Sequence, residues 1–118
     1  MIKELGAVPE IIIDPDELKQ VFINLINNAI NAMPDGGDLT IKTFKETADV
    51  CVQVSDTGVG IAQENIPRIF DPFFSTRHES AGLGLSIVHR IITKYGGTID
   101  VKSKIKEGTM FTLKFPAA

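Results

Sequence analysis

Disulfides, membrane spans and a strong basic charge are all missing from this sequence, and each absence excludes a class of protein. Cys51 is the only cysteine, so no internal disulfide can form and we expect a reducing compartment. No apolar run approaches the roughly 18 residues of a membrane-spanning helix, and no signal-peptide pattern opens the chain. The net charge of -3 argues against a surface for nucleic acid or anionic membrane. We therefore expect a cytoplasmic domain, at the cytoplasmic face where a parent protein is membrane-anchored.

The hydrophobic pattern predicts a single α/β domain over residues 1–118. Asp14 and Pro15 should start the first long helix, and Gly96-Gly97 should end the second. This pattern predicts a two-layer sandwich with a mixed sheet of about five strands and helices on one face. Strands are expected at residues 2–5, 10–13, 39–44, 50–55, 98–103 and 109–115, and helices at 15–33, 63–70 (short) and 83–95.

Residues 56–81 show little regular pattern apart from that short helix. A stretch of this length inside a compact domain is usually a functional lid or a disordered segment.

Several asparagines fall within the first long helix, although asparagine is a mediocre helix former. At about 100° per residue, Asn24, Asn28 and Asn31 share one narrow stripe beside the apolar face. A solvated polar face is one interpretation of this stripe. For Asn24 and Asn28 we favour a pocket lining, because an amide oxygen can bind a Mg²⁺ ion that already carries phosphate oxygens.

Asp56 continues a strand whose valines alternate with more polar residues, and it shares the parity of the valines. The carboxylate is therefore aimed at the core side of the sheet, where it needs a hydrogen-bond donor. An adenine amino group is a suitable donor, whereas guanine would place an acceptor against an acceptor. Gly58 and Gly60 would let the backbone pass close to a flat base. An ordinary Asp-Thr-Gly turn is the alternative.

Glycines also open the second long helix, in the run GLGLS at residues 82–86. Bare N–H groups and the positive end of the helix dipole there suit a phosphate. The run is not a Rossmann fingerprint, because Ile87 stands where the third glycine belongs, and no Walker A sequence occurs. Thr109 has the parity of an inward strand residue, so it either faces Asp56 from a neighbouring strand or is simply a β-strand threonine.

Taken together and in this order, these runs resemble the GHKL ATPases (the Bergerat fold), and specifically the catalytic domains of two-component sensor histidine kinases. Five boxes of that family are matched, by QVFINLINNAINA at residues 20–32, DTGVGI at 56–61, FDPFFST at 70–76, GLGLSIV at 82–88 and GTMF at 108–111. The resemblance extends over residues 14–115, and five boxes in order are a specific signal.

The resemblance implies binding of ATP or ADP with Mg²⁺. Asn28 would be the Mg²⁺ ligand, and Asp56 would hold the adenine amino group with Gly60 and Thr109 close by. Further nucleotide-binding positions that the boxes imply are Asn31, Gly58, Ile61, Thr76, Leu83 and Leu85.

The resemblance also implies how the phosphates are held. Gly82 and Gly84 would let the helix start meet them, Phe70 and Phe73 would anchor the lid, and Arg77 could reach the terminal phosphates. Many relatives carry a basic residue where Asn31 stands and glycines where residues 80–81 stand, which puts more weight on Arg77.

Asn24 stands where gyrase-type members carry a glutamate that activates water. An amide cannot act as a base, so we expect slow ATP hydrolysis and transfer of the γ-phosphoryl group to a histidine, whose neutral imidazole is already nucleophilic. Asn24, Asn28 and Arg77 are the candidate catalytic residues.

The acceptor histidine is not expected in this chain, because the only His-Glu pair, at residues 78–79, lacks the proline that follows in kinase acceptors. We expect a dimerising acceptor domain of the same kinase before residue 1, a response regulator as the next partner, and a monomeric isolated domain. Two alternative functions are a protein-serine kinase of the anti-sigma type and a non-catalytic nucleotide-sensing module.

Overall fold

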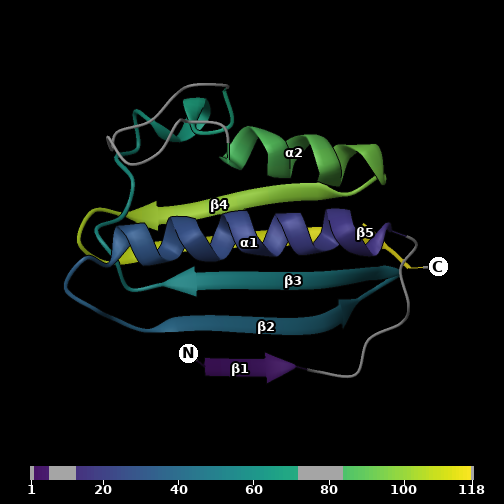
Figure 1. The fold of residues 1–118 in the computed structure, drawn as a ribbon, viewed down its shortest axis with the longest axis horizontal. Coiled ribbons are helices and arrows are strands. Elements are labelled where there is room, and N and C mark those ends of the chain that lie inside the picture. Colours follow the sequence, from purple (N-terminus) through teal and green to yellow (C-terminus); the bar gives the residue numbers. More distant parts are fainter. Residues whose placement is uncertain (1, 6–12, 72–83, 118) are drawn as a thin grey trace.

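The fold is a mixed sheet with two helices packed on one face, in a computed structural model that describes residues 2–5, 13–71 and 84–117. The five strands lie in the order β1-β2-β3-β5-β4. Only β1 and β2 pair in parallel; the other neighbouring pairs are antiparallel (Figure 1). The strand bounds are Ile2–Leu5 (β1), Leu39–Glu46 (β2), Asp49–Asp56 (β3), Thr98–Lys104 (β4) and Gly108–Pro116 (β5).

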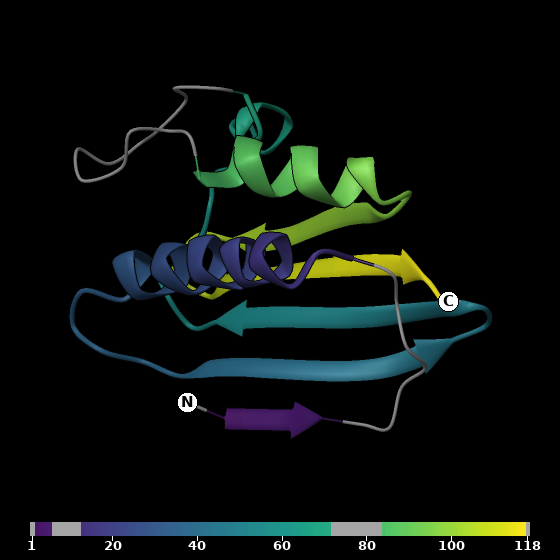
Figure 2. The same ribbon diagram turned by 45° about the vertical axis from the view of Figure 1, so that its right-hand side comes forward.

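The long helices are α1, Pro15–Ala32, and α2, Gly84–Lys94. They pack against each other, and α1 also contacts β3 while α2 contacts β4. Figure 2 shows both helices over the same face of the sheet. The predicted two-layer α/β sandwich with a mixed sheet is therefore confirmed. Within the described part of the chain, no helix has the length and apolar character to cross a membrane.

The start of α1 follows from its sequence. The Oδ1 atom of Asp14 accepts a hydrogen bond from the backbone N of Asp16 at 2.8 Å, and Pro15 stands at the first turn. The apolar residues then recur at helical spacing and pack into the core. The buried members of α1 are Val21, Leu25, Ala29 and Ala32.

Two predicted elements differ from the structure. The short helix expected over residues 63–70 is only a 3₁₀ turn, η1, at Ile66–Arg68, flanked by turns. Pro67 lies in this turn and cannot donate a backbone hydrogen bond, so a longer helix is not supported there. Most of the strand expected at residues 10–13 lies outside the described residues, and Ile13 belongs to no strand.

The inner face of the sheet is apolar over most of its length. Phe111, Leu113 and Phe115 of β5 are 0–2% exposed and pair with the valines of β3.

Cys51 lies on the opposite face of the sheet, where alternation predicts exposure, yet it is fully buried between Phe44 and Lys114 in the register. Burial raises the pKa of the Cys51 thiol, which disfavours the reactive thiolate.

Candidate functional site

Asp56 is the last residue of β3, and its side chain is buried, with 7% of the residue exposed. The inward direction predicted from strand parity is therefore confirmed. Its Oδ1 atom accepts a hydrogen bond from the backbone N of Gly58 at 2.8 Å. The Asp-Thr-Gly turn considered as an alternative is thus present, and it coexists with a carboxylate on the core side of the sheet.

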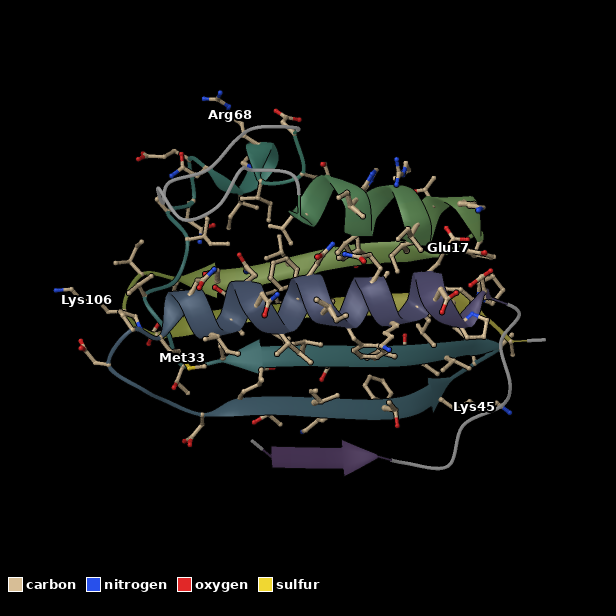
Figure 3. The ribbon with its side chains drawn as sticks, viewed as in Figure 1. Glu17, Met33, Lys45, Arg68 and Lys106 are labelled. Carbon is tan, nitrogen blue, oxygen red and sulfur yellow. The ribbon has the colours of Figure 1, made fainter. Side chains whose placement is uncertain are left out.

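Polar side chains from three strands lie next to one another at this end of the inner face. In the register Asp56 is directly opposite Thr109, and Thr109 is directly opposite Ser103. All three residues are buried, at 7%, 5% and 9% exposure. The Oγ atoms of Ser103 and Thr109 are 2.9 Å apart. The apolar core therefore ends in a compact polar row, near the β4–β5 turn where Figure 3 labels Lys106.

Ser103 was not among the candidate residues from the sequence. Its Oγ accepts from the backbone N of Ile61 at 2.7 Å and donates to the carbonyl oxygen of Gly108 at 2.8 Å. The side chain of Gln63 donates to the Ser103 carbonyl oxygen at 2.6 Å. The signal that could have found Ser103 is its parity with Ile99 and Val101 on β4, which makes it a polar residue at an inward position.

Gly58 and Gly60 are required by the packing of the chain itself. A Cβ atom on Gly58 would lie 2.4 Å from the carbonyl oxygen of Ala32 at the end of α1. Gly60 has φ +76°, and its Cβ would lie 2.1 Å from the carbonyl oxygen of Lys104. The close approach of a base, which the sequence suggested as the reason for these glycines, is thus not needed to explain them. Because these two residues have no side chain, the loop after β3 can pack closely between the end of α1 and the end of β4.

The asparagine stripe of α1 faces the start of α2. The Nδ2 atom of Asn24 donates to the carbonyl oxygen of Gly84 at 3.3 Å, and Gln20 donates to the Oδ1 atom of Asn24 at 3.0 Å. Asn28, one turn later, is half-buried, whereas Asn31 is exposed. The stripe therefore joins the two helices at Asn24 and becomes more solvated toward Asn31.

Phe70 packs against both α2 and the sheet. Its ring centroid lies 5.5 Å from that of His89 and 6.5 Å from that of Phe111. Phe70 therefore holds the chain at residue 70 against α2 and the sheet, and its predicted role as a lid anchor stays a prediction. Leu85 of α2 packs against the hydrophobic core. The other predicted positions, Phe73, Thr76, Arg77, Gly82 and Leu83, lie outside the described residues.

A second polar cluster joins the helices at the other end of α1, where Figure 3 labels Glu17. The Oε1 atom of Glu17 accepts from Nζ of Lys94 at 2.8 Å and from the hydroxyl of Tyr95 at 2.5 Å. These bonds, first from Lys94 and then from Tyr95, hold the pKa of Glu17 below its ordinary value. The Tyr95 hydroxyl also accepts from the backbone N of Asp14 at 3.3 Å. This cluster positions α2 relative to α1 and lies away from the polar row.

The side chains present suit a cation only together with a ligand that supplies oxygens. Across residues 2–5, 13–71 and 84–117, no three His, Cys, Asp or Glu side chains gather as a metal site would require. Asn28 offers a neutral amide oxygen one turn after Asn24, at a half-buried position of α1. One amide suits a Mg²⁺ ion that keeps phosphate oxygens and waters as its other ligands.

Comparison with known proteins identifies the family. The model described as histidine kinase-, DNA gyrase B-, and HSP90-like ATPase matches residues 13–118. Sensor histidine kinase ZraS of Escherichia coli K12 is 44% identical over 110 residues, which are 93% of this chain and 24% of that protein. Sporulation kinase E of Bacillus subtilis is 39% identical over 114 residues, which are 95% of this chain and 15% of that protein. The chain therefore spans about a quarter or less of these relatives.

Solved structures of histidine kinases have the same fold as this chain. The nucleotide-free catalytic domain of histidine kinase ThkA has a TM-score of 0.86 and 34% identity, covering 98% of this chain and 76% of that one. Full-length ShkA in complex with AMPPNP has a TM-score of 0.87 and 30% identity, covering 99% of this chain and 26% of that one. The chain therefore belongs to the histidine kinase-, DNA gyrase B- and HSP90-like ATPases, as an ATP-binding catalytic domain of the histidine kinase type.

Proposed function

We propose that this domain binds Mg²⁺-ATP and transfers the γ-phosphoryl group to a histidine on a dimerisation domain of the same kinase. A response regulator would be the next acceptor in a two-component pathway. The observation that carries the proposal is the buried pair of Asp56 and Thr109, which face each other across β3 and β5. The chain covers 24% of ZraS and 15% of sporulation kinase E, so residues 1–118 would serve as one domain of a longer kinase whose acceptor histidine lies in another domain.

The polar row supports an adenine site. An ionised carboxylate only accepts hydrogen bonds, so the buried Asp56 side chain favours a ligand edge that donates. The exocyclic amino group of adenine donates, whereas the corresponding oxygen of guanine accepts. A guanine base would therefore leave two acceptors in contact inside a buried site, which is costly.

The start of α2 supports a phosphate site next to the asparagine stripe. The first N–H groups of a helix have no partner within the helix, and they lie at the positive end of its dipole. Gly84, the first residue of α2 as described, brings no side chain of its own to this helix start and lies against Asn24. The polyphosphate would bind here, with Asn28 as ligand of the Mg²⁺ ion. Bound Mg²⁺ would neutralise charge on the phosphates during transfer.

Asn24 favours transfer over hydrolysis. Its amide is held by Gln20 on one side and by the Gly84 carbonyl on the other. An amide has no basic lone pair at neutral pH, so this side chain positions α2 and does not deprotonate a water. We propose that Arg77 adds positive charge at the terminal phosphates, in the part of the chain outside the described residues.

Transfer to the acceptor hairpin of the parent kinase, supplied in trans with γ-labelled ATP, tests the proposal. We expect label on the hairpin with the acid lability of a phosphoramidate, because phosphohistidine has a P–N bond. Acid-stable label would favour the serine kinase, and nucleotide binding without label would favour the sensing module. Asn28→Ala should abolish transfer, whereas Asn27→Ala, at an exposed neighbour on the same helix, should not.

A further inference from the structure

Ser103 contacts three polar groups at once. Its Oγ accepts from the backbone N of Ile61 at 2.7 Å, donates to the carbonyl oxygen of Gly108 at 2.8 Å, and lies 2.9 Å from Oγ1 of Thr109. A serine hydroxyl has one hydrogen and two lone pairs. These three contacts therefore use its whole hydrogen-bonding capacity.

The three contacts determine where the hydroxyl hydrogens lie. The Gly108 carbonyl can only accept, so it must receive the single hydrogen of Ser103. The N–H of Ile61 occupies one lone pair of Ser103. The remaining contact is then a hydrogen bond that Thr109 donates to Ser103. If Ser103 instead donated to Thr109, two oxygen atoms would lie 2.8 Å apart at Gly108 with no hydrogen between them.

This arrangement makes Thr109 an acceptor toward any other partner. In the register Thr109 lies directly opposite Asp56, and a carboxylate also only accepts. Toward a bound base, both side chains can then only accept, and they lie side by side at a buried end of the inner face. A base that reaches both must present a donor to both.

We propose that Ser103 determines the base specificity of the site, by holding the Thr109 hydroxyl as an acceptor that favours a 6-amino purine over a 6-oxo purine. The inference depends on the proposed adenine site at Asp56 and adds a second acceptor to it. Ser103 does not touch the base; it is a positioning residue that acts through Thr109. Without it, the Thr109 hydroxyl can rotate and donate to a 6-oxo group.

Titration of Mg²⁺-ADP and Mg²⁺-IDP into this chain measures its preference for a 6-amino over a 6-oxo purine, because the two nucleotides differ only at this edge of the base. In Ser103→Ala the preference for ADP over IDP should fall about tenfold, the discrimination typical of one polar contact. Ser103→Thr keeps the hydroxyl and should keep the native preference. Equal weakening of both nucleotides in Ser103→Ala would show a purely structural role and overturn the inference.

Ser103→Ala in a Thr109→Val background tests whether Ser103 acts through the Thr109 hydroxyl. No hydroxyl remains to be oriented, so Ser103→Ala should leave the ratio of the two affinities unchanged there. A tenfold fall in this background too would overturn the inference. If the native chain binds neither nucleotide, the proposed function fails together with the inference. If it prefers ADP and Ser103→Ala does not move the ratio, the inference alone fails.

The native chain offers a test that does not depend on any variant folding. The Thr109 hydroxyl hydrogen should show a nuclear Overhauser contact to the β-protons of Ser103. A contact to the β-protons of Asp56 instead would show that the Thr109 hydroxyl hydrogen points toward Asp56 and not toward Ser103, which would overturn the inference.

Discussion

The Nδ2 atom of Asn24 in α1 donates a hydrogen bond to the carbonyl oxygen of Gly84, the first residue of α2, at 3.3 Å. Gln20 donates to the Oδ1 atom of the same amide at 3.0 Å and so sets which way the amide points. The asparagine stripe therefore joins the two helices at the point where the proposed phosphate site begins.

Asn24→Asp should destabilise the domain by about 1–2 kcal/mol, because it places a charged acceptor against the acceptor oxygen of Gly84. Asn27→Asp is a matched control, since Asn27 is exposed on the same helix. Urea unfolding of both variants measures the difference. Equal losses of stability would show that the bond to Gly84 contributes nothing.

Gly84→Ala should separate stability from binding. The nearest atoms to an added Cβ are Cβ and Cγ of Asn24, each at the ordinary contact distance of 3.9 Å. The substitution should therefore leave the melting temperature unchanged or raise it, since alanine favours a helix by up to about 1 kcal/mol over glycine. The affinity for Mg²⁺-ADP should fall, because the methyl group lies beside the proposed phosphate site. A stable variant with native affinity would argue against phosphate at this helix start.

Gly60→Ala should unfold or severely destabilise the domain, and Gly96→Ala should not. The two glycines have nearly the same backbone angle, φ +76° and +77°. At Gly96 the nearest atom to an added Cβ is Cγ of Pro116 at 3.7 Å, so only backbone strain of about 1–2 kcal/mol is expected. At Gly60 the Cβ would collide with the Lys104 carbonyl oxygen at 2.1 Å, and the β4–β5 turn would have to move. Similar melting temperatures for the two variants would contradict this account.

The stability that Glu17 contributes should depend on pH. Lys94 and Tyr95 lower the pKa of Glu17 in the folded state, so its contribution is complete above the ordinary value of 4.5 and is lost as pH falls through the lowered value. At pH 6 the native chain should have a higher melting temperature than Glu17→Gln. The difference between the two melting temperatures should disappear as pH falls below 4.5. High salt should narrow the gap at pH 6, because the ion pair is partly exposed. A gap that stays constant down to pH 3 would contradict this assignment.

Much of the fold was predictable because local signals and burial agree. Asp14 and Pro15 start α1 as predicted, and the inward parity of Asp56 and Thr109 follows from simple strand alternation. The helix predicted over residues 63–70 was wrong: only the 3₁₀ turn η1 forms there, because Pro67 lacks the backbone N–H that a longer helix needs. Cys51 breaks the alternation because its burial depends on residues of both neighbouring strands.

The site was predictable where one residue type stands out, and not where partners decide the role. The asparagines are unusual within a helix, so the stripe was visible in the sequence. Ser103 is an ordinary strand residue until β5 brings Thr109 and Gly108 against it. The reason for Gly60 likewise depends on Lys104, which is far away in the sequence.

The most direct test of the central claim is a calorimetric titration of Mg²⁺-ADP and Mg²⁺-GDP into the native chain and into Asp56→Asn. Asparagine keeps the shape of the side chain and can still accept from Gly58, but its amide nitrogen is a donor. We predict that the native chain binds ADP and not GDP, and that Asp56→Asn loses at least about tenfold in ADP affinity. A folded native chain that does not bind ADP, or an Asp56→Asn variant that binds it as the native chain does, would contradict the adenine site.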